Sequence, residues 1–136
     1  MKKFFLGILA GVGFLVLSSC GGNNYPRADN ELVAAQSFLE ACMKGDFKEA
    51  GFYMIQDSVN KTDLQKIKDA YYKYDADRRQ AYRTADIIIQ NNEAVDSATK
   101  VITYQNSLDK NMQKLKVVNQ NNDWKIDLKY TFSGNL

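Results

Sequence analysis

The stretch Trp124-Lys125-Ile126-Asp127-Leu128-Lys129-Tyr130 decides the fold, because apolar and charged side chains alternate along it without exception. Successive side chains of a β-strand point to opposite faces of a sheet, so the alternation predicts a strand with one buried face and one solvated face. The charged members of the stretch, Asp127 among them, are therefore expected to point outward into solvent.

Three earlier stretches also have the composition of strands, and short polar turns separate them. The predicted strands cover residues 83–90, 97–104 and 112–118, and the predicted turns cover residues 91–93, 108–111 and 119–123. The strand at 97–104 is apolar on both faces, which favours a central place in the sheet. Consecutive strands joined by short turns predict an antiparallel meander.

Helical periodicity fills the chain before these strands. The first predicted helix runs from about Glu31 to Lys44, with Asp29 or Asn30 as its N-cap and Gly45 as its C-cap residue. Its core face is predicted from apolar residues at three-to-four spacing: Leu32, Ala35, Leu39, Cys42 and Met43, with Phe38 on the shoulder.

Two further helices are predicted after Gly45. Asp46 and Glu49 have the spacing of a capping box, in which each side chain accepts a hydrogen bond from the backbone amide of the other residue. The third helix is the longest, with Thr62 as its N-cap and an apolar face that continues as far as Arg78. Helices followed by a four-stranded meander indicate an α+β fold, with the helices packed on one face of the sheet.

Three motifs are shared with a known superfamily: an opening helix with Phe38, Leu39 and Ala41, the turn Lys44-Gly45-Asp46-Phe47 with Ala50 after it, and Asn122-Asp123-Trp124-Lys125-Ile126. Together with the order of the elements, they resemble the nuclear transport factor 2-like superfamily, also described as cystatin-like. More narrowly, the chain is similar to small bacterial lipoproteins of uncharacterised function with that fold. The resemblance implies a strongly curved sheet that wraps around a helix and leaves a conical cavity. None of the three motifs is catalytic.

The N-terminal segment predicts export and lipidation. Two lysines precede an apolar run over residues 4–17, which is shorter than the roughly 20 residues needed to span a bilayer. The tetrapeptide Leu17-Ser18-Ser19-Cys20 resembles the bacterial lipobox, which implies cleavage between Ser19 and Cys20 and attachment of diacylglycerol to the Cys20 thiol. Several acyl chains on one N-terminal cysteine would anchor the protein stably to a membrane.

The predicted organisation has three parts. Residues 1–19 are the signal peptide, residues 20–28 are the lipidated cysteine with a flexible tether, and residues 29–136 form a single α+β domain. The predicted location is the cell envelope. Gly21 after the lipidated cysteine favours the outer membrane facing the periplasm over the inner membrane, and exposure at the cell surface stays open.

Composition excludes several classes of function. The chain has no histidine, which removes histidine-based zinc sites and Ser-His-Asp or Cys-His catalysis, and Cys42 is the one cysteine left after lipidation. Neither a metal nor a cofactor is expected. Loss of the two signal lysines leaves 16 basic residues against 16 acidic ones, so no nucleic-acid partner is expected either. Acidic neighbours also offset the interleaved tyrosines and arginines of residues 71–83, which are expected to form an amphipathic helix.

Three functions are consistent with these patterns. The first is a non-catalytic binding module for a small apolar ligand or a protein partner, with candidate pocket-lining residues Phe38, Tyr53, Tyr71, Tyr104 and Trp124.

The second is an isomerase-like or cyclase-like enzyme, which the resemblance implies would use a tyrosine and a carboxylate inside the cone. The alternation places Asp127 outward and Asp86 on the face opposite Ile87 and Ile89, so the sequence identifies no catalytic carboxylate. The third function is a homodimeric assembly module that pairs through the outer sheet face at Val101, Thr103 and Val118.

Overall fold

The chain folds as an α+β domain, described by a computed structural model for residues 24–132. The predicted signal peptide and the lipidation site at Cys20 lie outside the described residues. The elements follow one another as α1 (Glu31–Lys44), α2 (Phe47–Phe52), α3 (Ser58–Lys73), α4 (Ala76–Thr84), β1 (Ile87–Ala94), β2 (Thr99–Asn106), β3 (Gln113–Gln120), β4 (Asp123–Asp127) and α5 (Leu128–Phe132).

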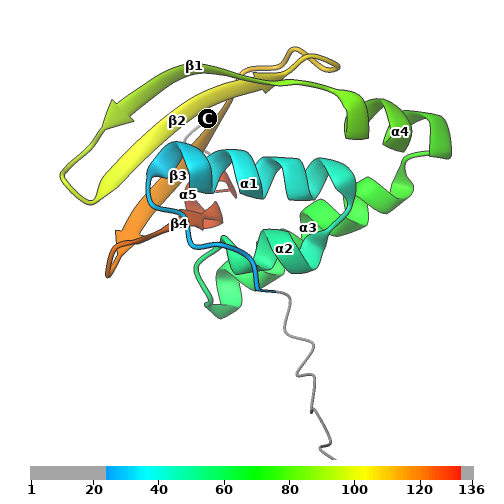
Figure 1. The fold of residues 1–136 in the computed structure, drawn as a ribbon. Helices are drawn as coiled ribbons and strands as arrows, with labels where there is room; N and C mark the ends of the chain where they lie inside the picture. The colour runs from blue at the N-terminus through cyan, green and yellow to red at the C-terminus, as the bar shows by residue number, and fades with distance from the viewer. Residues whose placement is uncertain (1–23, 133–136) are drawn as a thin grey trace, which may run out of the picture.

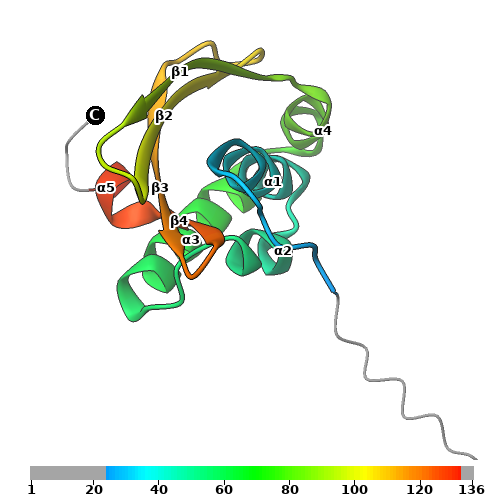
Figure 2. The ribbon, with the colours of Figure 1, turned by 60° about the vertical axis from the view of Figure 1, so that its left-hand side comes forward.

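The four strands form one antiparallel sheet in the order β1-β2-β3-β4, which confirms the predicted meander and the central place of β2. The sheet curves over α1, which contacts all four strands, while α2 and α4 pack against α1 (Figures 1 and 2). The core lies between α1 and the concave face of the sheet, where Ile102, Leu115, Val117 and Ile126 are almost completely buried.

Helix α1 has the predicted bounds because its sequence encodes both ends locally. The Asn30 side chain accepts a hydrogen bond from the Val33 amide at 2.9 Å, which satisfies a backbone donor of the first turn. Gly45 ends the helix with φ at 79°, in the left-handed region that glycine adopts at little steric cost.

The buried face of α1 is turned relative to the prediction. Its buried residues are Ala34, Ala35, Phe38, Leu39 and Ala41. Leu32, which the spacing of large apolar residues placed in the core, is 42% exposed. Packing on two sides, by the sheet and by α2, buries small alanines that a pattern of large side chains does not reveal.

Only half of the predicted capping box forms at α2. The Asp46 side chain accepts from the Glu49 amide at 3.0 Å, as predicted. The Asp46 amide, however, donates to the Ala41 carbonyl oxygen at 2.8 Å, a bond that closes the end of α1. Because that amide is already paired, it needs no hydrogen bond from the Glu49 side chain.

Helix α3 begins five residues earlier than predicted. Its N-cap is Asp57, which accepts from the Asn60 amide at 2.8 Å, and Thr62 lies inside the helix. The Thr62 hydroxyl donates to the Ser58 carbonyl oxygen at 2.9 Å. Aspartate and threonine are both good N-caps, so local propensity alone did not separate the two positions.

The predicted long helix is in fact two helices. Tyr74 has extended backbone angles and ends α3, and Asp75 then caps α4 by accepting from the Arg78 amide at 2.8 Å. The apolar stripe continues across the break, which is why periodicity did not reveal it. The break matters because it turns α4 to the side of α1 (Figure 1).

Strand β1 runs through the predicted turn at residues 91–93 and continues to Ala94. A register shift between Ile89 and Asn91 marks a β-bulge. The turn itself lies at residues 95–98, where the Val95 amide donates to the Thr99 carbonyl oxygen at 3.0 Å. Consecutive asparagines favour turns but do not prevent pairing with a strand as strong as β2.

The alternating stretch from Trp124 to Tyr130 forms a shorter strand than predicted. Strand β4 ends at Asp127, and α5 starts at Leu128. The fully buried Asn60 side chain accepts a hydrogen bond from the Leu128 amide at 2.6 Å. That bond ties the first residue of α5 to α3. Helix α5 lies beside the half of β3 that β4 leaves unpaired, and its Thr131 hydroxyl donates to the Lys114 carbonyl oxygen at 3.2 Å.

The prediction that Asp127 points into solvent is wrong. Asp127 is 7% exposed, and its carboxylate accepts from the Asn60 amide group at 3.4 Å. The ammonium groups of Lys116 and Lys129 lie 3.6 and 3.8 Å from its oxygens, so this buried charge is compensated. Lys129 also pairs with Asp57 at 2.8 Å, and the Asn60 backbone amide and the Lys129 ammonium lower the pKa of Asp57 to about 2.

Candidate functional site

A cavity of about 450 Å³ lies between α1, α3, α4, α5 and the concave face of β2 and β3. We call it the inner cavity. Its apolar lining comprises Phe38, Leu39, Cys42, Met43, Ile67, Ala70, Leu115 and Leu128. The exposed residues Lys66, Ala70 and Gln113 lie at its mouth. Pockets of about 300 to 1,000 Å³ with mostly apolar walls are typical sites for small molecules.

Three of the five predicted pocket-lining residues meet in the inner cavity: Phe38, Tyr71 and Tyr104. Tyr53 and Trp124 are buried elsewhere, so their prediction as lining is wrong. The Tyr53 hydroxyl donates to the Pro26 carbonyl oxygen at 3.0 Å, and the Trp124 amide donates to the Ala28 carbonyl oxygen at 3.2 Å. The segment before α1 therefore covers both aromatic residues.

Most of the polar side chains on the cavity wall are neutral. The Tyr104 hydroxyl donates to the Gln113 side-chain oxygen at 2.7 Å, and burial raises the pKa of Tyr104 above its usual range. Burial also raises the pKa of the Cys42 thiol to about 12, so it is protonated at neutral pH. A protonated thiol is neither a nucleophile nor a metal ligand, which fits the predicted role of Cys42 as a small core residue.

The sequence did not reveal a carboxylate that the structure places at this cavity. Asp109, in the loop between β2 and β3, pairs with the Arg78 guanidinium at 3.0 Å and accepts a hydrogen bond from the Tyr82 hydroxyl. The Tyr74 and Tyr82 rings stack with centroids 5.3 Å apart, and the Arg78 guanidinium lies 4.7 Å from the Tyr74 centroid.

This cluster ties α4 to the β2–β3 loop. Burial, and then the hydrogen bond to Asp109, raises the pKa of Tyr82 above its usual range, so its hydroxyl is a neutral donor. Both Asp109 oxygens are engaged, one by Arg78 and one by Tyr82. A carboxylate held in this way by two side chains of α4 fixes the β2–β3 loop against that helix.

The outer sheet face differs from the surface predicted for a homodimer. Val101, predicted as exposed there, is 7% exposed, and its partners in the sheet register are Glu93 and Lys116. Thr103 and Val118 are partly exposed. The buried Val101 therefore has a charged neighbour on each side across this face, Glu93 on β1 and Lys116 on β3.

Within residues 24–132, no group of three or more cysteine, aspartate or glutamate side chains is placed to hold a metal ion. No helix in this part of the chain has the length and apolar character needed to cross a membrane.

Comparison of the chain with models of protein families, with curated proteins and with solved structures finds no match. The resemblance to nuclear transport factor 2-like lipoproteins therefore stays a prediction from the sequence. The α+β architecture and the geometry of the inner cavity rest on the structure alone.

Proposed function

We propose that this chain is a lipid-anchored protein of the cell envelope whose inner cavity binds a small, mostly apolar ligand without transforming it. The observation that carries the proposal is the inner cavity, which lies under a curved sheet and has a wall of aliphatic and aromatic side chains. Burying apolar ligand surface in such a cavity contributes roughly 25 cal/mol per Å².

The polar groups of the cavity would orient the ligand. Tyr104 and Gln113 form a hydrogen-bonded pair on one wall, and Lys66 lies at the mouth. An apolar molecule with one polar end would place its apolar body against Phe38 and Leu115 and its polar end near the mouth. A few directed polar groups in an apolar wall are the usual source of selectivity in small-molecule sites.

Closing the mouth should abolish binding of a neutral apolar fluorophore, N-phenyl-1-naphthylamine. Ala70 is an exposed residue of α3 that lines the cavity, so Ala70→Phe places a ring across the entrance. We expect the unchanged protein to show saturable fluorescence enhancement and the variant to bind at least about tenfold more weakly, a difference of about 1.4 kcal/mol.

The matched control is Lys61→Phe, which adds the same ring to an exposed position of α3 outside the cavity. It should bind the fluorophore as the unchanged protein does. Equal binding by Ala70→Phe and Lys61→Phe would show that the fluorophore binds elsewhere, and the proposed ligand site would be wrong.

The anchor rests on Leu17-Ser18-Ser19-Cys20. Cys20→Ala removes the thiol that accepts the diacylglycerol, so we expect no incorporation of radiolabelled palmitate when the variant is expressed in bacteria. Cys42→Ala is the matched control, because it removes the other cysteine and should keep the label. Label retained by Cys20→Ala would contradict the anchor while leaving the cavity proposal untouched.

A second candidate is an isomerase-like or cyclase-like enzyme, and the observation that favours it is the Asp109 carboxylate beside the Tyr82 hydroxyl. A general base must reach the proton that it takes, and both oxygens of Asp109 already bind other side chains, one Arg78 and one Tyr82. We therefore rank non-catalytic binding first.

A further inference from the structure

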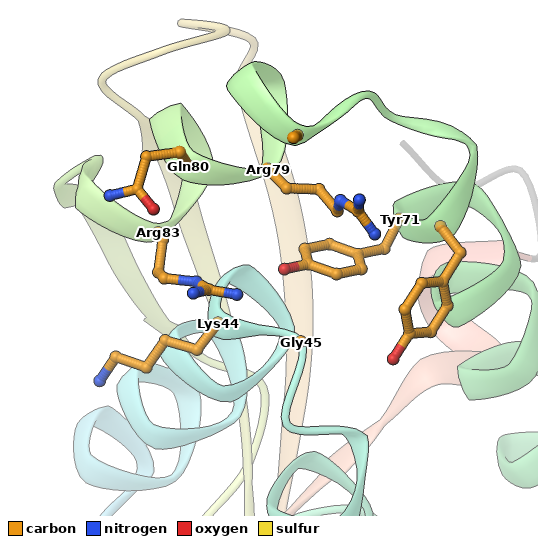
Figure 3. Close-up of a pocket in the computed structure, with 8 residues that line it drawn as sticks. Lys44, Gly45, Tyr71, Arg79, Gln80 and Arg83 are labelled. Atoms are coloured by element: carbon orange, nitrogen blue, oxygen red, sulfur yellow. The ribbon is translucent and has the colours of Figure 1, made fainter.

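A second pocket lies on the other side of Tyr71 from the inner cavity. It is about 430 Å³ in volume, and we call it the basic pocket. Its lining comes from the end of α1, the end of α3 and one face of α4: Lys44, Gly45, Tyr71, Tyr72, Ala76, Arg79, Gln80 and Arg83 (Figure 3). Three of these residues are cationic and none is acidic.

Two of the cations are unpaired. Arg79 and Arg83 are one turn apart on α4, which places both guanidinium groups on the same face of the helix. Neither forms an ion pair or side-chain hydrogen bond with any residue in the described range 24–132. Arg78, their neighbour on α4, is by contrast paired with Asp109.

The third cation is only weakly compensated. The Lys44 ammonium lies 3.3 Å from one Glu40 oxygen, and about half of each side chain is exposed. An exposed pair of this kind contributes little and leaves the ammonium able to turn toward another anion. The basic pocket thus holds three positive charges against the single negative charge of Glu40.

A buried hydroxyl also points into the basic pocket. Tyr71 is 7% exposed, and its hydroxyl has no hydrogen-bond partner within the described part of the chain. Figure 3 shows this hydroxyl directed into the space bounded by Arg79, Arg83 and Gly45. Buried polar groups are nearly always hydrogen-bonded, so an unpaired one beside free cations indicates an absent acceptor.

Gly45 makes room for this hydroxyl. A Cβ atom at position 45 would lie 2.9 Å from the Tyr71 hydroxyl oxygen and 2.8 Å from a ring carbon, closer than side chains approach. The Phe47 ring packs edge-on against Tyr71 with centroids 5.6 Å apart and holds it from the other side. The hydroxyl is therefore fixed in place by packing before any ligand binds.

We propose that the basic pocket binds a phosphate group. The guanidinium forks of Arg79 and Arg83 and the Tyr71 hydroxyl face this space, and Lys44, whose ammonium pairs with Glu40, lies at its edge. These are more donors than the two oxygens of a carboxylate would use. Arginine forks match the spacing of phosphate oxygens and bind them in pairs. The Tyr71 hydroxyl supplies a further donor to a remaining phosphate oxygen.

The phosphate could be part of a soluble molecule or of a lipid head group, and two probes separate these sources. The full chain, purified in a neutral detergent, is titrated with inorganic phosphate and separately with glycerophosphoglycerol, the soluble head group of an anionic phospholipid. Sodium chloride holds the ionic strength constant, because screening weakens exposed charge pairs. Calorimetry should show saturable binding of at least one probe.

Three variants test the assignment. Arg79→Gln, Arg83→Gln and Tyr71→Phe should each weaken binding of that probe at least about fivefold, since charge-assisted hydrogen bonds are the strongest polar contacts. Lys61→Gln is the matched control, because it removes one exposed positive charge outside the basic pocket and should bind as the unchanged protein does. Thermal unfolding confirms that each variant is folded.

Tyr71→Phe is the most informative variant. It keeps the ring against Gly45 and Phe47 and removes only the hydroxyl, so loss of binding without loss of stability assigns that hydroxyl to the ligand. Binding of inorganic phosphate alone points to a soluble phosphate, and binding of glycerophosphoglycerol alone points to a lipid head group. Absence of saturable binding to both probes, or equal weakening by Lys61→Gln, would overturn the proposal.

Discussion

Trp124→Ala is expected to lower the free energy of unfolding by about 3 to 5 kcal/mol, the range found for large aromatic truncations in cores. Trp124 is 8% exposed and belongs to the core cluster with Phe38, Ile126 and Leu128. Removing the indole leaves a cavity under the β3–β4 hairpin, because Trp124 pairs with Asn119 next to that turn and its backbone is held by the Ala28 carbonyl oxygen.

Urea unfolding followed by circular dichroism measures this change, and the midpoint should fall at an unchanged slope. Trp124→Phe is the matched control, because it keeps an aromatic ring in the site and should lose clearly less stability. A loss below about 1 kcal/mol for Trp124→Ala would mean that the indole contributes no more than a surface side chain.

Asn60→Leu is expected to lower the free energy of unfolding by about 2 to 4 kcal/mol although it adds apolar surface to a buried site. The Asn60 side chain accepts from the Leu128 amide and donates to both Asp57 and Asp127. Leucine has a similar volume but no polar atoms. The substitution leaves the Leu128 amide without its acceptor and deprives the buried Asp127 carboxylate of a donor.

Hydrogen exchange and a control variant separate this loss of stability from a simple packing defect. Hydrogen exchange at the Leu128 amide should accelerate more than exchange at the Ile126 amide, whose acceptor is the Tyr53 carbonyl oxygen. Thr62→Ala, at an exposed position of the same helix, should change stability by no more than about 0.5 kcal/mol. If Asn60→Leu were as stable as the unchanged protein, the hydrogen bond that Asn60 of α3 accepts from Leu128 of α5 would contribute nothing to the free energy of unfolding.

The sequence predicts those parts of the fold that depend on neighbours in the chain. Asn30 and Gly45 each act within a few residues, so the bounds of α1 are predicted correctly. The alternation that starts at Trp124 correctly identifies β4, and the α+β class follows from the order of elements.

Contacts between distant residues decide the parts that sequence patterns miss. The alternation continues to Tyr130, but β4 ends at Asp127, and the next amide, that of Leu128, is bound by Asn60 from far earlier in the chain. The same contact explains why Asp127 is buried. A period-2 pattern reports which side chains alternate, and it does not report where a distant element binds the strand.

The candidate site also has parts that the sequence predicts and parts that depend on contacts between distant residues. Phe38 and Tyr104 line the inner cavity from α1 and β2, two elements whose presence the sequence predicts. Asp109 lies in the predicted turn at residues 108–111, but the pattern that predicts a turn does not indicate that its side chain reaches the inner cavity. Arg79 and Arg83 form the basic pocket only because Asp75 breaks the predicted long helix and turns α4 toward Lys44.

The two edge strands of the sheet, β1 and β4, differ in whether a strand of another copy could pair with them. On β4, the Tyr53 carbonyl oxygen and the Ile55 amide occupy the outward backbone groups of Ile126, so that edge is closed to another strand. The β1 edge is unpaired within the described residues, and its bulge and polar side chains make it a poor template. A fibre grows only if every copy offers two usable edges. Even a copy that paired through β1 would form a closed pair, and polymer growth would end at two chains.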